Sequence, residues 1–178
     1  MPLTKQLSTC LQIIATSLVL VLPIGSVAKA EPVKIFDGYD AYGGDYRSLD
    51  NVQLPDCKTI CEATDDCVAF TYNLESRTCF LKGAAPNLYR TKQAISGVKE
   101  SSASSVSFRD DMEVLVGLSI YGVTYNALSR MDFESCFELC ERDDLCKGFT
   151  LRSSRCELKL RIGRFSKRSK TVSGVKNR

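Results

Sequence analysis

The chain has 178 residues, with 24 lysines and arginines against 21 aspartates and glutamates, so its formal net charge is only +3. It contains no histidine, which excludes a Ser-His-Asp triad or a Cys-His nucleophile pair and leaves only cysteine as a ligand for a zinc site. Nine cysteines in a chain of this length are instead typical of an exported protein with structural disulfides.

Residues 1–30 have the composition of a secretory signal peptide. A basic start precedes an apolar run from Leu11 to Leu22, and Ala28-Lys29-Ala30 forms an A-x-A cleavage site. The run is about a dozen residues long, too short for a helix to span a bilayer core of about 30 Å. We therefore predict cleavage between Ala30 and Glu31, no transmembrane segment after cleavage, and a secreted or periplasmic protein.

The eight cysteines after the signal form one spacing pattern that occurs twice. Cys57-x3-Cys61-x5-Cys67-x11-Cys79 recurs as Cys136-x3-Cys140-x5-Cys146-x9-Cys156. The flanks repeat as well, because Ser96-Gly97-Val98-Lys99 returns as Ser173-Gly174-Val175-Lys176. The pattern predicts two small disulfide-stabilised modules, over residues 31–99 and 112–178. Spacing alone leaves three possible pairings for each set of four cysteines.

A glycine- and tyrosine-rich segment over residues 37–46 opens the first module. Its tyrosines, Tyr39, Tyr42 and Tyr46, offer flat apolar faces with hydroxyls, which suit a sugar or peptide ligand. The alternative is that they pack the module's own core, and this is favoured for Tyr42 and Tyr46 because they recur as Tyr121 and Tyr125. Tyr39 has no tyrosine counterpart, so both interpretations stay open for it.

A short helix and a hairpin follow in each module. The C-x3-C pair places Cys57 and Cys61 on one helix face, one turn apart. The β-rich segments 67–72 and 79–82, separated by polar turn residues, predict a hairpin packed on that helix. In the second module, Asp132 is predicted to cap the corresponding helix. We therefore expect an α+β fold in which each module is one helix packed on an antiparallel sheet.

Residues 100–111 are predicted to link the two modules. Their first part, residues 100–107, is rich in serine and has no apolar periodicity, which is typical of a flexible linker. The charge differs on its two sides. Residues 31–100 carry eight basic and eleven acidic side chains, whereas residues 101–178 carry fourteen basic and ten acidic ones.

The chain from Lys159 to its end has eight basic residues and no acidic one. One interpretation is a solvated strand edge whose charges resist aggregation. The other is an electrostatic surface for an acidic glycan, an acidic protein or the lipid headgroups of an envelope surface. Its candidate contacts are Arg164, Lys167, Arg168 and Lys170. Nucleic acid is not an expected partner of an exported protein.

The cysteine pattern and its flanks resemble the PAN/apple family. The shared features are the C-x3-C helix, the third cysteine five residues on, the strand Phe70-Thr71-Tyr72 and a final C-x-L-K strand. Gly43-Gly44-Asp45-Tyr46-Arg47 and the Ser-Gly-Val-Lys segment are similar to bacterial PAN modules in particular. The resemblance covers nearly all of residues 35–99 and 115–176. It implies nested disulfides, which pair Cys57 with Cys79, Cys61 with Cys67, Cys136 with Cys156 and Cys140 with Cys146.

The resemblance also implies a binding function. We expect an exported, non-catalytic protein whose tandem modules recognise a protein or carbohydrate ligand. The alternative is an envelope accessory or structural protein that assembles with a larger partner, such as a protease or a protease inhibitor. We predict no enzymatic activity, no cofactor and no metal site. The acid pairs Asp65-Asp66 and Asp143-Asp144 follow the predicted helices, where solvated turn residues are favoured over a weak Ca²⁺ contact.

Overall fold

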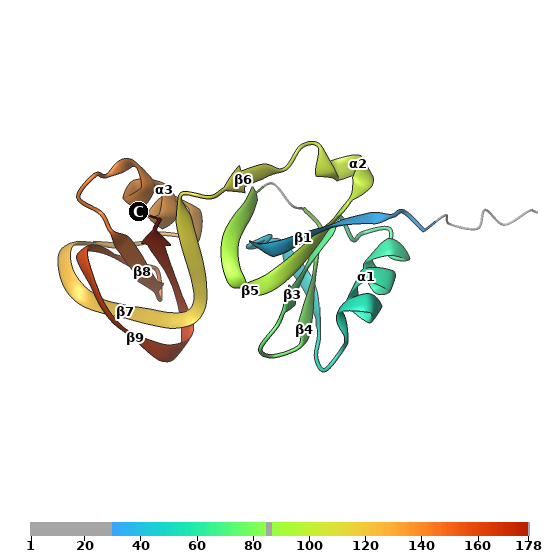
Figure 1. Cartoon of the computed structure of the whole chain (residues 1–178), viewed down its shortest axis with the longest axis horizontal. Coiled ribbons are helices and arrows are strands. Elements are labelled where there is room, and N and C mark those ends of the chain that lie inside the picture. The colour runs from blue at the N-terminus through green and yellow to red at the C-terminus, as the bar shows by residue number, and fades with distance from the viewer. Residues whose placement is uncertain (1–29, 85–86, 178) are drawn as a thin grey trace, which may run out of the picture.

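The computed structural model describes residues 30–84 and 87–177, so the predicted signal peptide lies outside the described residues. Two sheet-based modules lie side by side in the chain (Figure 1). Each holds one longer helix and one sheet, so the expected α+β fold is confirmed. Within the described ranges, no helix is long and apolar enough to cross a membrane.

The first module is built on an antiparallel sheet. Its strands are β1 (Val33–Asp40), β2 (Asp45–Leu49), β3 (Ala69–Asn73), β4 (Thr78–Lys82) and β5 (Asn87–Lys99), in the order β1-β5-β3-β4-β2. Helix α1 (Leu54–Glu62) buries Cys57 and Cys61 against this sheet. The core around these cysteines includes Phe70 and Leu81 from the sheet.

The second module has the same plan with fewer and longer strands. They are β7 (Met112–Ser129), β8 (Gly148–Arg152) and β9 (Arg155–Lys176), in the order β7-β9-β8. When the two copies are aligned, β7 corresponds to β1 and β2 of the first module, and β9 corresponds to β4 and β5. Register shifts interrupt the antiparallel pairing of β7 with β9, for example between Val116 and Leu118. Such irregularities bend a strand. One long bent strand of the second module therefore follows the path that two separate strands follow in the first module.

Helix α3 (Phe133–Arg142) begins where the sequence predicts. The N-cap Asp132 accepts a hydrogen bond from the backbone N–H of Ser135 at 2.8 Å, which satisfies one free donor of the first turn. The prediction of this cap is therefore confirmed. The helix buries Phe133, Cys136, Phe137 and Cys140 on one side.

Two disulfides tie each helix to its own module. The bonds are Cys57–Cys79, Cys61–Cys67, Cys136–Cys156 and Cys140–Cys146, the pairs that the family resemblance implies. Among the described residues no disulfide crosses between modules, and all eight of these cysteines are fully buried. A disulfide typically stabilises a domain by about 2–4 kcal/mol, which is large for units of this size.

The repeated Ser-Gly-Val-Lys segment has the same structural roles in both modules. A Cβ atom on Gly97 would lie 2.2 Å from a ring carbon of Phe70, and one on Gly174 would lie 2.3 Å from a ring carbon of Phe149. Each aromatic ring therefore needs a glycine beneath it. The lysine that ends the segment donates to a carbonyl just past the helix, from Lys99 to Thr64 and from Lys176 to Asp143, at 2.9 Å in both cases.

The Ser-rich stretch has more regular structure than its composition predicts. It forms helix α2 (Glu100–Ala103) and strand β6 (Ser107–Arg109), and β6 pairs in parallel with β5. The ring of Phe108 in β6 lies edge-on to the rings of Phe36 and Tyr39, at 5.6 and 5.3 Å between centroids. These contacts with the first module hold a segment that serine content alone marks as flexible.

The two modules share an aromatic interface. Tyr89 of β5 is 1% exposed and belongs to the core of the second module, where its ring lies 4.9 Å from Phe133 and 5.0 Å from Phe137. Its hydroxyl donates to Glu134. Gln93 adds a polar contact, because its amide accepts from the backbone N–H of Val116 at 2.7 Å and donates to the Val116 carbonyl at 3.2 Å.

Candidate functional site

A cavity of about 310 Å³ lies in the first module, where β1 ends and the loop toward β2 begins. Its lining comes from that loop with the adjoining ends of β1 and β2, from β3, β4 and β5, and from one residue of β7. The polar and aromatic lining residues include Asp40, Tyr42, Asp45, Thr71, Phe80 and Lys82. We call this cavity pocket 1.

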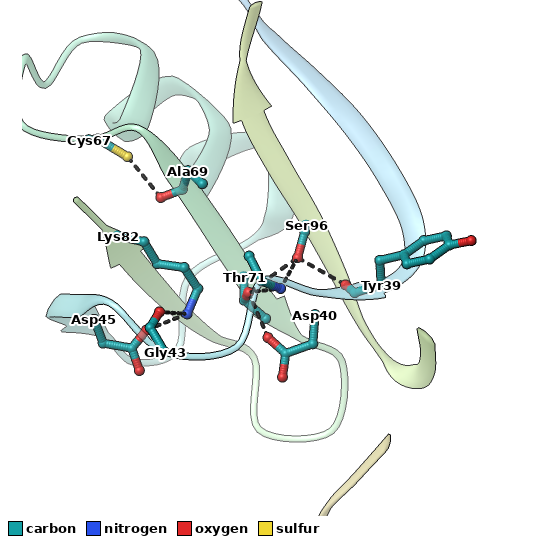
Figure 2. Close-up of polar contacts among 10 residues, drawn as sticks. Tyr39, Asp40, Gly43, Asp45, Cys67, Ala69, Thr71, Lys82 and Ser96 are labelled. Carbon is teal, nitrogen blue, oxygen red and sulfur yellow. Dashed lines mark hydrogen bonds and ion pairs between the residues drawn. The ribbon is translucent and has the colours of Figure 1, made fainter. Parts of the chain in front are cut away.

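Two hydroxyls hold the backbone at the floor of pocket 1. The backbone N–H of Ala41 donates to Thr71 Oγ1 at 3.2 Å and to Ser96 Oγ at 2.9 Å. Ser96 Oγ donates in turn to the carbonyl of Tyr39 at 2.9 Å. Figure 2 shows these side chains meeting between β3 and β5, beside Asp40. The floor is therefore fixed before any ligand arrives.

Asp40 is a buried carboxylate in the wall of this pocket. Its Oδ1 accepts from Thr71 Oγ1 at 2.8 Å, which leaves Oδ2 without a partner among the described residues. Burial raises the pKa of Asp40 because the charged form loses hydration, while the neighbouring Lys82 and the Thr71 hydrogen bond act in the opposite direction. A buried carboxylate with a free acceptor atom is suited to ligand hydroxyls.

Lys82 is a buried ammonium that also lines pocket 1, with a side chain only 2% exposed. It donates to the Gly43 carbonyl at 3.0 Å and forms an ion pair with Asp45 (Figure 2). An ammonium has three donors, so one is left after these two contacts. Pocket 1 therefore offers a donor and an acceptor from two opposite charges.

The second module helps to complete pocket 1. Val116 of β7 is among the lining residues, and Gln93 holds it there through both amide atoms. The half-buried ring of Tyr42 lies against Phe133, with 4.0 Å between their centroids. Burial raises the pKa of the Tyr42 hydroxyl. One wall of the pocket is thus held in place by the neighbouring module.

A second cavity, which we call pocket 2, occupies the equivalent place in the second module. Its volume is about 790 Å³. The floor repeats, because the backbone N–H of Ile120 donates to Thr150 Oγ1 at 3.1 Å and Thr150 Oγ1 lies 3.0 Å from Ser173 Oγ. The buried lysine repeats as Lys159, which donates to Thr124 Oγ1 and to Glu157, both at 2.8 Å.

The tyrosines singled out from the sequence lie in different places. Only Tyr42 lines pocket 1. The Tyr39 hydroxyl donates to Asp110 at 2.8 Å, a contact that raises its pKa, and Tyr46 is 45% exposed outside the pocket lining. Of the four repeated tyrosines, Tyr125 packs against the core of its own module. Tyr121 is 40% exposed, and Tyr42 packs on the other module.

The four basic residues singled out near the C-terminus make different contacts. Arg164 lies over the ring of Tyr121, 4.9 Å from its centroid. Lys167 forms an ion pair with Glu75 of the first module, which raises the pKa of Lys167. Arg168 lines pocket 2, and Lys170 lines a cavity beside Phe133.

Several pocket residues were missed from the sequence. These are Asp40, Thr71 and Lys82 in pocket 1, and Arg152, Arg155 and Lys159 in pocket 2. The recurrence of Thr71 as Thr150 and of Lys82 as Lys159 is visible when the two copies are aligned, and it is the signal that could have found them. Within the described ranges, the structure has no group of three or more acidic or cysteine side chains placed to hold a metal ion.

Comparisons with known proteins agree on one kind of module. The family model for the PAN domain matches twice, over residues 39–82 and 119–159, and each match ends at the buried lysine of a pocket. Micronemal protein 4 of Toxoplasma gondii is 28% identical over 124 residues, which are 68% of this chain and 20% of that protein. The chain thus spans about a fifth of the length of this curated relative.

Two solved structures are also similar. A PAN module from Eimeria tenella has 30% sequence identity, and the match covers 36% of this chain and 78% of that one, with a TM-score of 0.31. The two N-terminal apple domains of Toxoplasma gondii microneme protein 4 have 22% identity over 82% of this chain and 94% of that one, with a TM-score of 0.30.

Proposed function

Because the chain belongs to the PAN domain family and carries two of its modules, we propose that it is a non-catalytic binding protein that holds a neutral saccharide in pocket 1. The observation that carries this proposal is the pair of buried opposite charges, Asp40 and Lys82, on a fixed floor of hydroxyls. Each charge keeps hydrogen-bonding capacity for a ligand.

The lining of pocket 1 suits a sugar ring. Adjacent sugar hydroxyls both donate and accept, so they complement the carboxylate of Asp40 and the ammonium of Lys82 at the same time. Phe80 and Tyr42 supply apolar faces for the carbon side of a ring. A volume of about 310 Å³ is at the lower end for ligand sites, which favours one small ring over a peptide segment.

Export is part of the proposal. Eight cysteines in four disulfides require an oxidising compartment, which fits a protein that acts in a secretory or extracellular space. Binding in such a space needs no catalytic group. Two modules in one chain would also increase the strength of binding to a surface that displays many copies of a ligand.

The test is binding of the oxidised chain to an array of neutral glycans, followed by calorimetry with the sugar that is retained. Asp40→Asn preserves the shape of the side chain but removes its charge, so the affinity should fall on the order of tenfold or more. Asp37→Asn is the matched control, because Asp37 is exposed on the same strand. Thermal melts of both variants show whether the fold is retained.

Two results would count against saccharide binding at pocket 1. One is a blank array with the folded wild-type chain, and the other is equal affinity of the Asp40→Asn variant. A blank array together with a stable co-purifying partner would favour an envelope assembly protein that docks on a protease or protease inhibitor.

A further inference from the structure

Pocket 2 keeps the floor of pocket 1 but reverses its charge. Ser119 stands where the first module has Asp40, and Thr124 stands where it has Asp45, so both carboxylates are gone. The reverse change brings in arginines, because Arg152 replaces Asn73 and Arg168 replaces Thr91. Four basic side chains and one acidic side chain line the pocket, counting Arg155, Lys159 and Glu157 as well.

Much of this positive charge is available to a ligand. The single acid, Glu157, lies 2.8 Å from Lys159 and 3.5 Å from Arg155, and these contacts lower its pKa. Arg152 and Arg168 are exposed, and neither has an acidic side chain within 4.0 Å in the described part of the chain. Two arginines thus remain for an anionic ligand.

The arginines reach pocket 2 from separate parts of the module. Arg152 is the last residue of β8, Arg155 is the first residue of β9, and Arg168 lies in the second half of β9. β8 pairs with both halves of β9, since Arg152 is opposite Arg155 and also opposite Thr171. The folding of β9 back along β8 therefore places these charges around one cavity.

We propose that pocket 2 binds an anionic saccharide, that is, a sugar ring carrying a carboxylate or a sulfate ester. Guanidinium groups bind the oxygens of both anions through paired hydrogen bonds. This site is separate from pocket 1, and its ligand belongs to a different chemical class. The inference does not require that pocket 1 bind a neutral sugar.

The remaining lining of pocket 2 explains why the anion is expected on a sugar. The volume of about 790 Å³ is far larger than an isolated anion needs. Hydroxyls of Ser119, Thr124 and Ser129 line it beside the ring of Tyr121. Arg164 packs on that ring at 4.9 Å from its centroid, which restricts the ring's movement. Hydroxyls and an aromatic face suit the uncharged part of a sugar.

The experiment measures, by calorimetry, the binding of glucuronate, glucose 6-sulfate, glucose and inorganic sulfate to the oxidised full chain. NMR amide shifts then locate the binding site. Glucuronate or glucose 6-sulfate should bind, with shifts around residues 119–124 and 152–155. Glucose should cause no shifts there. Affinity should fall as salt is raised from about 0.05 to 0.5 M, because these charges are partly exposed to solvent.

Two substitutions give pocket 2 the residues of pocket 1. Arg152→Asn and Arg168→Thr should each weaken binding of the anionic sugar on the order of tenfold, the usual effect of losing a hydrogen bond to a charged group. Arg161→Thr is the matched control, because Arg161 is exposed on the same strand but lines a different cavity. This control should retain its affinity within about twofold.

Four outcomes would overturn the inference. In the first outcome, neither anionic sugar binds. In the second, the amide shifts lie away from pocket 2. In the third, the Arg161→Thr variant loses as much affinity as the Arg168→Thr variant, which would mean that binding depends only on overall charge. Finally, inorganic sulfate binds as tightly as glucose 6-sulfate, which would reduce the pocket to a site for small anions.

Discussion

Buried charges are retained in both modules although each has to be removed from water. Lys82 and Lys159 are 2% and 3% exposed, and each is compensated by a carboxylate and a neutral oxygen acceptor. Asp40 adds a buried carboxyl group, which has no counterpart among the described residues of the second module. Replacing a buried ion pair with apolar residues is often neutral or stabilising, so stability alone does not explain why these charges are present. A role in ligand binding gives a reason.

The stability of the first module should depend on pH through Asp40. Below the ordinary pKa of aspartate, this group is protonated in both the folded and the unfolded chain. As the pH rises from there through the raised pKa of the folded state, the unfolded chain loses its proton first, so the free energy of unfolding decreases. Each unit by which burial raises the pKa costs about 1.4 kcal/mol of stability above this range.

Urea unfolding at a series of pH values tests this dependence. The Asp40→Asn variant lacks the ionisable group, so its stability relative to wild type should increase as the pH rises through the same range. If wild type gained stability relative to the variant instead, the attraction of Lys82 would outweigh the effect of burial. Asp37→Asn, at an exposed position of the same strand, is the control.

At the scale of elements, the repeated segment in β5 and β9 joins each helix to its sheet. Its serine hydroxyl holds the pocket floor, its glycine lies under an aromatic ring, and its lysine bonds a carbonyl beyond the helix. One short stretch of strand therefore sets both the packing of the sheet and the shape of the pocket.

Gly97→Ala and Gly174→Ala should each destabilise their own module. The added methyl group would lie 2.2 or 2.3 Å from a ring carbon of Phe70 or Phe149, so ring and strand must separate. Overpacking of this kind typically costs about 1–3 kcal/mol, measurable by urea unfolding. Gly83→Ala should be close to neutral, because the nearest atom to the added methyl group is 4.0 Å away. If Gly97→Ala and Gly174→Ala were as stable as Gly83→Ala, the rings of Phe70 and Phe149 would be free to move aside.

At the scale of the whole molecule, the interface makes the two modules depend on each other. Tyr89 belongs to the first module by its place in the sequence, but its side chain packs in the core of the second. Conversely, Val116 of the second module lines pocket 1. The module boundaries proposed from the sequence still follow the cysteine sets. However, a cut between residues 99 and 112 would remove a buried aromatic residue from the core of the second module.

Tyr89→Ala should therefore weaken the coupling between modules. Loss of a large buried aromatic side chain costs about 3–5 kcal/mol, and here the loss falls at the interface. Calorimetry should show one cooperative transition for wild type and two separated transitions for the variant. Tyr46→Ala, at a 45% exposed position, should melt like wild type. Two transitions in the wild-type chain would instead show that the modules unfold independently.

The sequence alone determined features that depend on local spacing or on repetition. Two copies of one cysteine pattern indicated two modules, and the C-x3-C spacing placed two cysteines on one helix face. Asp132 was identified as an N-cap because a cap is recognised within four residues of the chain. The family resemblance supplied the pairing of the cysteines, which spacing left open.

Only the tertiary structure decided which side chains meet. Asp40, Thr71 and Lys82 lie on three different strands, and they come together because β5 pairs with both β1 and β3, and β3 pairs with β4. For Tyr42, core packing in its own module was favoured over a ligand contact, but its ring packs on Phe133 of the other module. For the basic C-terminal run, a solvated edge and an electrostatic surface were both considered, and the path of β9 brings Arg168 to a pocket and Lys167 to Glu75. Such contacts depend on how bent strands fold back in three dimensions, and the local spacing of residues carries no record of that path.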